Sequence, residues 1–111
     1  MTFDMSVWES ELRRGVVELC LLSAIRDQEG YGYEIIERVK ARSTLSLTES
    51  TVYPMLARLA KDGLLATRQS PSPSGPPRRY FRLTAKGIER LSSMKTHWRS
   101  LQKCVSKLIE D

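Results

Sequence analysis

The sequence is poor in several residue types on which whole classes of protein depend. Its 111 residues include two cysteines and one histidine, so neither a disulfide framework nor a metal site of cysteine and histidine ligands is expected. No apolar run approaches the roughly 20 residues that a membrane-spanning helix needs, and residues 1–8 lack the layout of a signal peptide. We therefore expect a cytoplasmic protein without cofactor or metal, in which Cys20 and Cys104 are reduced core or interface residues.

Groups that would support catalysis are equally sparse. The single histidine, His97, has no cysteine nucleophile at a recognisable spacing, and the sequence contains no glycine-rich phosphate-binding loop. The acidic residues are scattered, and a chain of this size has little room for a substrate cleft beside its core. An enzyme is therefore the least favoured class of function.

Positive charge, in contrast, is abundant and unevenly placed. The chain has a formal charge of +5, yet eight basic residues lie between Arg58 and Arg90, and only Asp62 and Glu89 oppose them. This segment has a surplus of six positive charges, and the rest of the chain is slightly negative. A concentrated basic segment suits a polyanion such as DNA, although a solvated basic surface would have the same composition.

The spacing of apolar residues predicts a mainly α protein with one small β-hairpin. Helical periodicity extends over residues 7–27, 32–42, 48–62 and 84–110. Strands are expected at residues 64–69 and 78–83, and the Ser/Pro/Gly-rich stretch between them should not support a ladder. Leu45 and Leu47 alternate as a minimal strand would.

The helix over residues 48–62 has the clearest start and end signals. Thr48 is the expected N-cap, and Gly63 is placed for a left-handed stop. Pro54 lies inside the helix, where some distortion is expected. The apolar stripe comprises Val52, Leu56 and Leu59.

Helices followed by a hairpin are the order of a winged helix-turn-helix, whose second motif helix enters the DNA major groove. The helix over residues 48–62 occupies that position. Its solvent face has hydroxyls and a guanidinium that suit phosphates and base edges, from Ser50, Thr51, Tyr53 and Arg58. Arg78 and Arg79, at the stem of the hairpin loop, would form a phosphate clamp. The alternatives are an ordinary polar helix face and solvated strand-end charges.

The apolar stripe of the last helix continues for roughly 40 Å. This length exceeds the width of so small a domain. A stripe that extends past its own domain needs another chain to cover it. We therefore expect one compact unit in which residues 1–83 bind DNA and residues 84–111 dimerise, the alternative being a helix folded back on its own chain. The expected interface residues are Leu91, Met94, Trp98, Leu101, Val105 and Leu108.

Four motifs in order resemble the PadR family of winged-helix transcriptional regulators. They are Glu11-Leu12-Arg13-Arg14-Gly15, Gly32-Tyr33-Glu34-Ile35, Thr48-Glu49-Ser50-Thr51-Val52-Tyr53-Pro54 and the stretch from Gly75 to Thr84. The resemblance covers about Glu11 to Lys107 and is to the short members, which have no separate C-terminal domain. Tyr31 departs from the pattern, because the family often has histidine there.

The resemblance implies a bacterial homodimer built from the first and last helices, usually a repressor at a palindromic operator. It places at the DNA the residues Tyr33, Ser50, Thr51, Tyr53, Pro54 and Arg58, together with Arg78 and Arg79 in the wing. A winged-helix module that binds proteins and not DNA is the alternative function.

Trp98 raises the question of a small-molecule effector. In some short members of the family a tryptophan at the matching place faces its mate across the dimer and stacks on flat aromatic compounds, for which planar cationic dyes are natural probes. The pocket residues would then be Leu12, Gly15, Leu19, Met94 and Trp98. Simple packing of Trp98 in the dimer core is the alternative, and it is slightly favoured.

Overall fold

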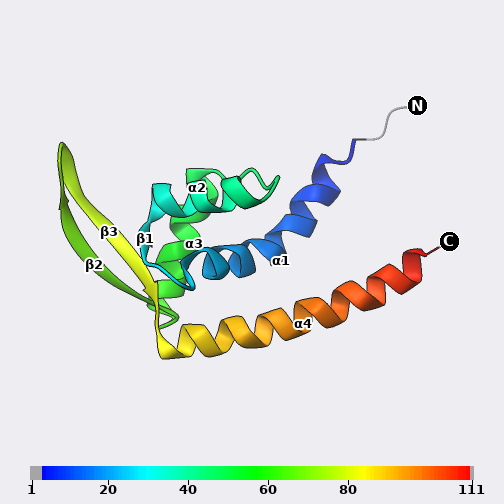
Figure 1. Cartoon of the computed structure of the whole chain (residues 1–111). Coiled ribbons are helices and arrows are strands. Elements are labelled where there is room, and N and C mark those ends of the chain that lie inside the picture. The colour runs from blue at the N-terminus through cyan, green and yellow to red at the C-terminus, as the bar shows by residue number, and fades with distance from the viewer. Residues whose placement is uncertain (1–3, 111) are drawn as a thin grey trace.

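The computed structural model describes residues 4–110, so residues 1–3 and 111, at the outer ends of the two predicted domains, lie outside it. The elements are α1 (Ser6–Ile25), β1 (Gly30–Tyr31), α2 (Gly32–Arg42), α3 (Glu49–Lys61), β2 (Leu65–Ser72), β3 (Gly75–Leu83) and α4 (Ala85–Ile109). Four helices and a hairpin-like wing confirm the predicted winged-helix fold, with a long last helix (Figure 1). Within the described residues, no helix is long and apolar enough to cross a membrane.

The core lies where α1, α2 and α3 meet the base of the sheet. Complete burial of an aliphatic side chain contributes roughly 1.5–3 kcal/mol, so the buried cluster of eleven aliphatic residues and Phe81 provides the main stabilising interactions of this part of the chain. The side chains with essentially no exposure are Leu21, Leu22, Ile25, Ile35, Val52, Leu56 and Leu59.

The ends of α3 follow the local signals of the sequence. Thr48 is the N-cap in extended conformation, and its carbonyl accepts the backbone N–H groups of Thr51 and Val52 at 3.1 and 3.0 Å. At the other end, Gly63 has a φ of +80°. The amides of Gly63 and Leu64 donate to carbonyls of the last helical turn at 3.1 and 2.9 Å, which satisfies groups that would otherwise have no partner.

The wing extends further than its composition predicts. β2 and β3 pair antiparallel from Leu65 opposite Leu83 to Ser72 opposite Gly75, so the expectation that the Ser/Pro/Gly stretch supports no ladder is wrong. The strand order β1-β3-β2 makes β2 an edge strand, and β1 pairs only with residues 80–81 of β3. The prolines therefore face no third strand, and an irregularity in the register between Ser70 and Ser72 accommodates them.

The third strand is not where the sequence pattern placed it. Leu45 and Leu47 lie outside any strand, and Leu47 packs against the core instead. Gly30 and Tyr31 form β1, opposite Phe81 and Tyr80. Two residues are too few to produce an alternating pattern, so only the tertiary contact with β3 reveals this strand.

The start of α4 is locked against the end of α3. The Thr84 hydroxyl donates to the Gly63 carbonyl at 2.7 Å and accepts the Gly87 amide at 3.0 Å. A Cβ on Gly87 would lie 2.1 Å from the Leu64 carbonyl oxygen, so only glycine permits this approach. Further along α4, Leu91 is 2% exposed in the core of its own chain, which corrects its expected place at a dimer interface.

Beyond Met94, α4 leaves the body of the molecule. Figure 1 shows its second half continuing alone, like the first turns of α1. Met94 still packs against the core. The later members of the stripe are exposed in this chain, to 37% at Trp98, 56% at Leu101, 43% at Val105 and 84% at Leu108.

Candidate nucleic-acid interface

The exposed face of α3 is opposite its buried stripe. Because Val52, Leu56 and Leu59 have no exposure, the orientation of the helix about its axis is fixed by the core. The face turned to solvent begins with Ser50 and Thr51 and continues with Tyr53, Pro54 and Arg58. Pro54 lies on this outer face, and α3 continues through it.

Tyr53 connects α3 to the start of α2. Its ring lies so close to Gly32 that a Cβ there would be 2.1 Å from the Tyr53 Cε1 atom. Partial burial and, to a lesser extent, the nearby Glu49 carboxylate raise the pKa of the Tyr53 phenol above its ordinary value. Tyr33, exposed on the first turn of α2, also belongs to this surface.

Tyrosines and arginines interleave where the wing meets α2. Tyr31 contacts Tyr80 edge-on with ring centroids 5.4 Å apart, and the guanidinium carbon of Arg78 lies 4.6 Å from the Tyr31 centroid. Arg68 lies 4.4 Å from the Tyr80 centroid. Such cation–π contacts hold a guanidinium without neutralising it. Tyr31 was not predicted as a site residue, because β1, which brings it to the wing, has no recognisable sequence signal. Arg68 was counted only as one of the cations of the basic segment.

Arg78 and Arg79 do not form the predicted clamp. Successive residues of a strand point to opposite faces, and β3 follows this rule: Arg78 lies over Tyr31, whereas Arg79 lies over Phe81 at 5.2 Å. The two guanidinium groups can therefore contact different phosphates, but not the same one from one side.

Three arginines of the basic segment, Arg58, Arg68 and Arg90, are paired with carboxylates. Arg68 donates from Nε to the Glu29 carboxylate at 2.9 and 3.1 Å, and this bond lowers the pKa of Glu29 and raises that of Arg68. Arg58 lies 3.3 Å from one oxygen of Glu18, whose other oxygen lies 3.3 Å from Arg90. Glu18, with a side chain only 16% exposed, thus joins α3 to α4, and it competes for the Arg58 guanidinium expected at DNA.

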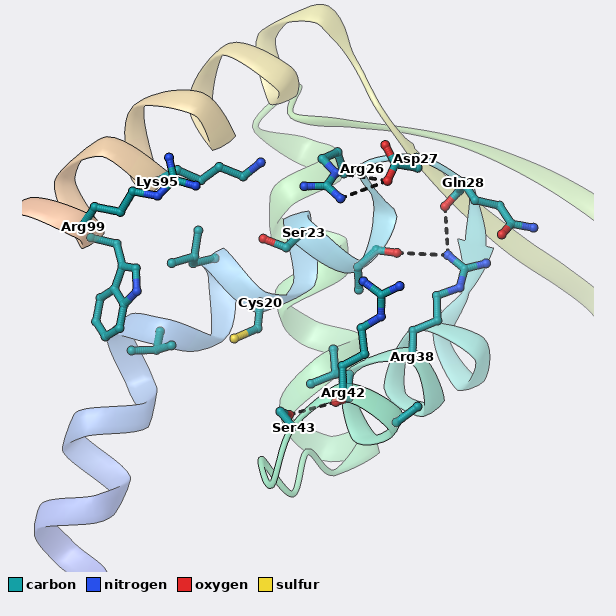
Figure 2. Close-up of a pocket in the computed structure, with 16 residues that line it drawn as sticks. Cys20, Ser23, Arg26, Asp27, Gln28, Arg38, Arg42, Ser43, Lys95 and Arg99 are labelled. Atoms are coloured by element: carbon teal, nitrogen blue, oxygen red, sulfur yellow. Dashed lines mark hydrogen bonds and ion pairs between the residues drawn. The ribbon is translucent and has the colours of Figure 1, made fainter. Parts of the chain in front are cut away.

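The expected effector pocket is only partly present within one chain. Leu19 and Trp98 line a groove of about 760 Å³ between α1, α2 and α4 (Figure 2). Leu12 is exposed outside it, a Cβ on Gly15 would meet nothing within 4 Å, and Met94 packs against the core. These three therefore do not line the groove of the single chain, and a pocket formed between two chains stays a prediction. The groove's basic side chains, which come from α2, α4 and the turn after α1, were not predicted from the sequence.

The cysteines are both free in this structure. Cys20 borders the groove, and burial raises the pKa of its thiol, which therefore stays protonated at neutral pH. Cys104 is exposed on the outer half of α4, so it is not a core residue of its own chain. Within residues 4–110, no group of three or more His, Cys, Asp or Glu residues is arranged to hold a metal ion.

The three-helix body, an α3 helix with one face buried and the other exposed, and the adjoining wing define the class of winged-helix DNA-binding proteins. The sequence also matches the Transcriptional regulator PadR-like family over residues 21–93. This chain therefore belongs to the PadR-like family of transcriptional regulators, which are DNA-binding regulators and not enzymes.

Solved structures of other family members have the same architecture. A PadR family transcriptional regulator from Eggerthella lenta is 33% identical, with a TM-score of 0.85 over 96% of this chain and 92% of that one. A PadR-like regulator from Bacillus cereus is 32% identical, with a TM-score of 0.79 over 91% and 98%. Bacillus subtilis PadR, solved in complex with operator DNA, is 25% identical, with a TM-score of 0.66 over 71% of this chain and 46% of that one.

Proposed function

We propose that this protein is a bacterial repressor that binds a palindromic operator as a homodimer, with α3 in the major groove. The observation that carries the proposal is the two-sided character of α3. One side is completely buried, and the other presents Ser50, Thr51 and Tyr53 to solvent beside the wing. Short hydroxyls near a helix N-terminus and an aromatic ring suit phosphates and base edges. The structure of Bacillus subtilis PadR in complex with operator DNA supports operator binding by a protein of this fold.

In this proposal the wing contacts the DNA backbone through separate arginines. Arg78, held over Tyr31, would contact a phosphate beside the start of α2, where Tyr33 is exposed. Arg79, on the opposite face of β3, would contact another. Phosphate contacts position a protein on the duplex without selecting the sequence, so base selection is assigned to α3.

The homodimer is inferred from apolar surface that this chain leaves uncovered. The outer half of α4 exposes Trp98, Leu101, Val105 and Leu108, and the first turns of α1 expose Val7, Trp8 and Leu12. Contiguous exposed apolar surface of this kind marks an interaction site. We assign DNA binding to residues 1–83 and dimerisation to residues 84–111, in a protein of the bacterial cytoplasm, where chromosomal DNA is located.

A small effector that binds near Trp98 and releases the operator completes the proposal. The support is the groove between α1, α2 and α4, which Leu19 and Trp98 line at the root of the outer half of α4. A ligand there would contact both the core and the helix assigned to dimerisation. Such a ligand is therefore placed to change the spacing of the two α3 helices.

The test is selection of bound duplexes from a random pool, followed by fluorescence anisotropy over a salt series. We expect a palindrome with half-sites about one helical turn apart, and an affinity that falls steeply as salt rises. Arg78→Gln and Arg79→Gln should each weaken binding to every sequence and reduce the salt slope by about one. Lys103→Gln, on the exposed outer half of α4, is the control.

Failure has a specific meaning in this experiment. If no sequence is enriched at low salt, with or without an added effector, the DNA-binding proposal is wrong, and a protein-interaction module becomes the better interpretation. If binding occurs but the arginine variants keep the affinity and salt slope of the parent, the wing has no part in it.

A further inference from the structure

Glu18 is a largely buried carboxylate that two guanidinium groups from different helices share. Its Oε1 atom accepts a hydrogen bond from Arg58 of α3 at 3.3 Å, and its Oε2 atom accepts one from Arg90 of α4 at 3.3 Å. Both arginine side chains are more than half exposed. One negative charge therefore lies between two positive charges that remain open to solvent.

The core fixes the positions from which these three side chains extend. Each of the three residues is the immediate neighbour in the chain of a buried core residue. Those neighbours are Val17, Leu59 and Leu91. The charged contact therefore joins α1, α3 and α4 at positions that apolar packing already holds in place.

Arg58 belongs to the side of α3 that is assigned to DNA. It lies seven residues after Thr51, and two turns of helix bring both residues to the same side. Its guanidinium is accessible, but part of its charge is neutralised by the Glu18 carboxylate. A phosphate of the duplex would therefore have to compete with Glu18 for Arg58.

Arg90 determines what happens to Glu18 when Arg58 is released. A largely buried carboxylate that loses every cationic partner is strongly disfavoured. Among residues 4–110, Arg58 and Arg90 are the cations that pair with Glu18, so Arg90 is the partner that remains. Arg90 therefore favours the release of Arg58, although it lies on α4 and not on α3.

We propose that Glu18 is a positioning residue that restrains Arg58 in the free protein and releases it to a DNA phosphate while Arg90 keeps the carboxylate paired. The inference rests on the proposed DNA-binding function and adds a restraint on the affinity of α3. It also connects that affinity to α4, the helix assigned to dimerisation. A displacement of α4 that removed Arg90 would leave Glu18 to Arg58 alone and weaken DNA binding.

The experiment measures the affinity of variants of the full chain for the selected operator by fluorescence anisotropy. We expect Glu18→Gln to bind the operator about two- to fivefold more tightly, because a neutral amide holds Arg58 less strongly. Arg90→Gln, which mimics the displacement of α4, should bind about two- to fivefold more weakly. An ion pair that only stabilised the fold would weaken binding in both variants, so the opposite signs identify the restraint.

Two controls separate this effect from a change of net charge. Glu89→Gln and Lys103→Gln change the net charge as the test variants do, and both residues are exposed on α4 without an ion pair among the described residues. Each control should change the affinity by less than about 1.5-fold, because distant exposed charges are screened. In an Arg58→Gln background, neither Glu18→Gln nor Arg90→Gln should change the affinity, since both act through Arg58.

Thermal unfolding followed by circular dichroism checks that each variant is folded at the temperature of the binding measurement. If Glu18→Gln does not fold, Arg90→Gln in the parent and Arg58→Gln backgrounds decides the question alone. The restraint is overturned if Glu18→Gln binds no more tightly than Glu89→Gln, or if either effect persists without Arg58. If the parent binds no duplex, the DNA-binding function is wrong and the restraint with it, whereas failure of the variants alone leaves that function intact.

Discussion

Two helices of this protein have the same kind of apolar stripe and opposite surroundings. In α3, the stripe of Val52, Leu56 and Leu59 is completely buried by the rest of the chain. In α4, a stripe with the same spacing of three and four residues is buried at Leu91 and exposed from Trp98 to Leu108. Periodicity therefore determines which face of a helix is apolar, but not which surface covers it.

The difference originates in how each helix is attached. The apolar face of α3 contacts the core along the length of the helix, and the glycine stop at Gly63 ends the helix there. Only the first turns of α4 are fixed, through the contacts of Thr84 and Gly87, and the helix then continues beyond its neighbours (Figure 1). The buried stripe stabilises the fold, whereas the exposed stripe is available to a second molecule.

The largest effect on stability should come from the buried stripe. Leu56→Ala removes a side chain with no exposure and leaves a cavity between α3 and its neighbours, so we expect a loss of about 2–5 kcal/mol in the free energy of unfolding. Chemical denaturation followed by circular dichroism measures the loss. Ala57→Ser, at the exposed neighbouring position, should change stability by less than about 0.5 kcal/mol. Equal losses in both variants would contradict the assignment of the core.

The exposed stripe should control association and not folding. The double substitution Leu101→Glu and Val105→Glu would place charges in the proposed interface, and we expect the dimer dissociation constant to rise about a hundredfold or more. Sedimentation velocity measures the shift to monomer, and the helical circular dichroism signal should persist. Lys103→Glu, on the same turns of α4, is the matched control. A parent protein that is already monomeric at micromolar concentration would refute the proposed dimer.

A smaller effect on stability and on operator affinity is expected for a substitution at the contact between α2 and α3. Gly32→Ala would place a methyl group against the Tyr53 ring, and because Tyr53 is partly exposed, the ring should move outward without unfolding the protein. We expect a stability loss of about 1 kcal/mol and an operator affinity lower by about tenfold. In a Tyr53→Ala background the additional Gly32→Ala change should cost little stability. A full loss in both backgrounds would show that Tyr53 is not the reason for glycine at this position.

The smallest effect concerns acid stability at the wing. The Arg68 guanidinium lowers the pKa of Glu29 in the folded protein below its ordinary value of 4.5. The pair therefore stabilises the fold above that value, and the contribution disappears as the pH falls through the lowered pKa. Thermal unfolding between about pH 3 and 7 should show Glu29→Gln losing less stability on acidification than the parent. Identical pH profiles would mean that the exposed pair adds nothing measurable.

Local signals in the sequence predicted most of the elements. The predicted helix over residues 32–42 coincides with α2, and the predicted N-cap Thr48 and stop Gly63 delimit α3. The errors involve contacts between distant segments: β1 was missed, the wing ladder was ended too early, and Leu91 was assigned to an interface. Each error depends on which surface a segment meets, and local spacing does not contain that information.

In the candidate site, too, one feature follows from the local sequence and others depend on contacts between distant segments. The alternation of β3 requires that Arg78 and Arg79 point to opposite faces, although the sequence analysis treated them as one clamp. The position of Arg78 over Tyr31 depends on β1, and the pairing of Arg58 with Glu18 depends on how α3 packs against α1. No spacing rule within one segment could have predicted either contact.

By itself, the sequence determined the order of the four helices and the two wing strands, the apolar face of each helix and the basic character of residues 58–90. These properties depend on residues close together in the chain. Only the tertiary structure decided that Tyr31 supports Arg78, that the α4 stripe is exposed beyond Met94, and that Arg42, Lys95 and Arg99 lie around one groove. The physical reason is that burial and electrostatic surroundings depend on neighbours in space, and here those neighbours come from helices far apart in the sequence.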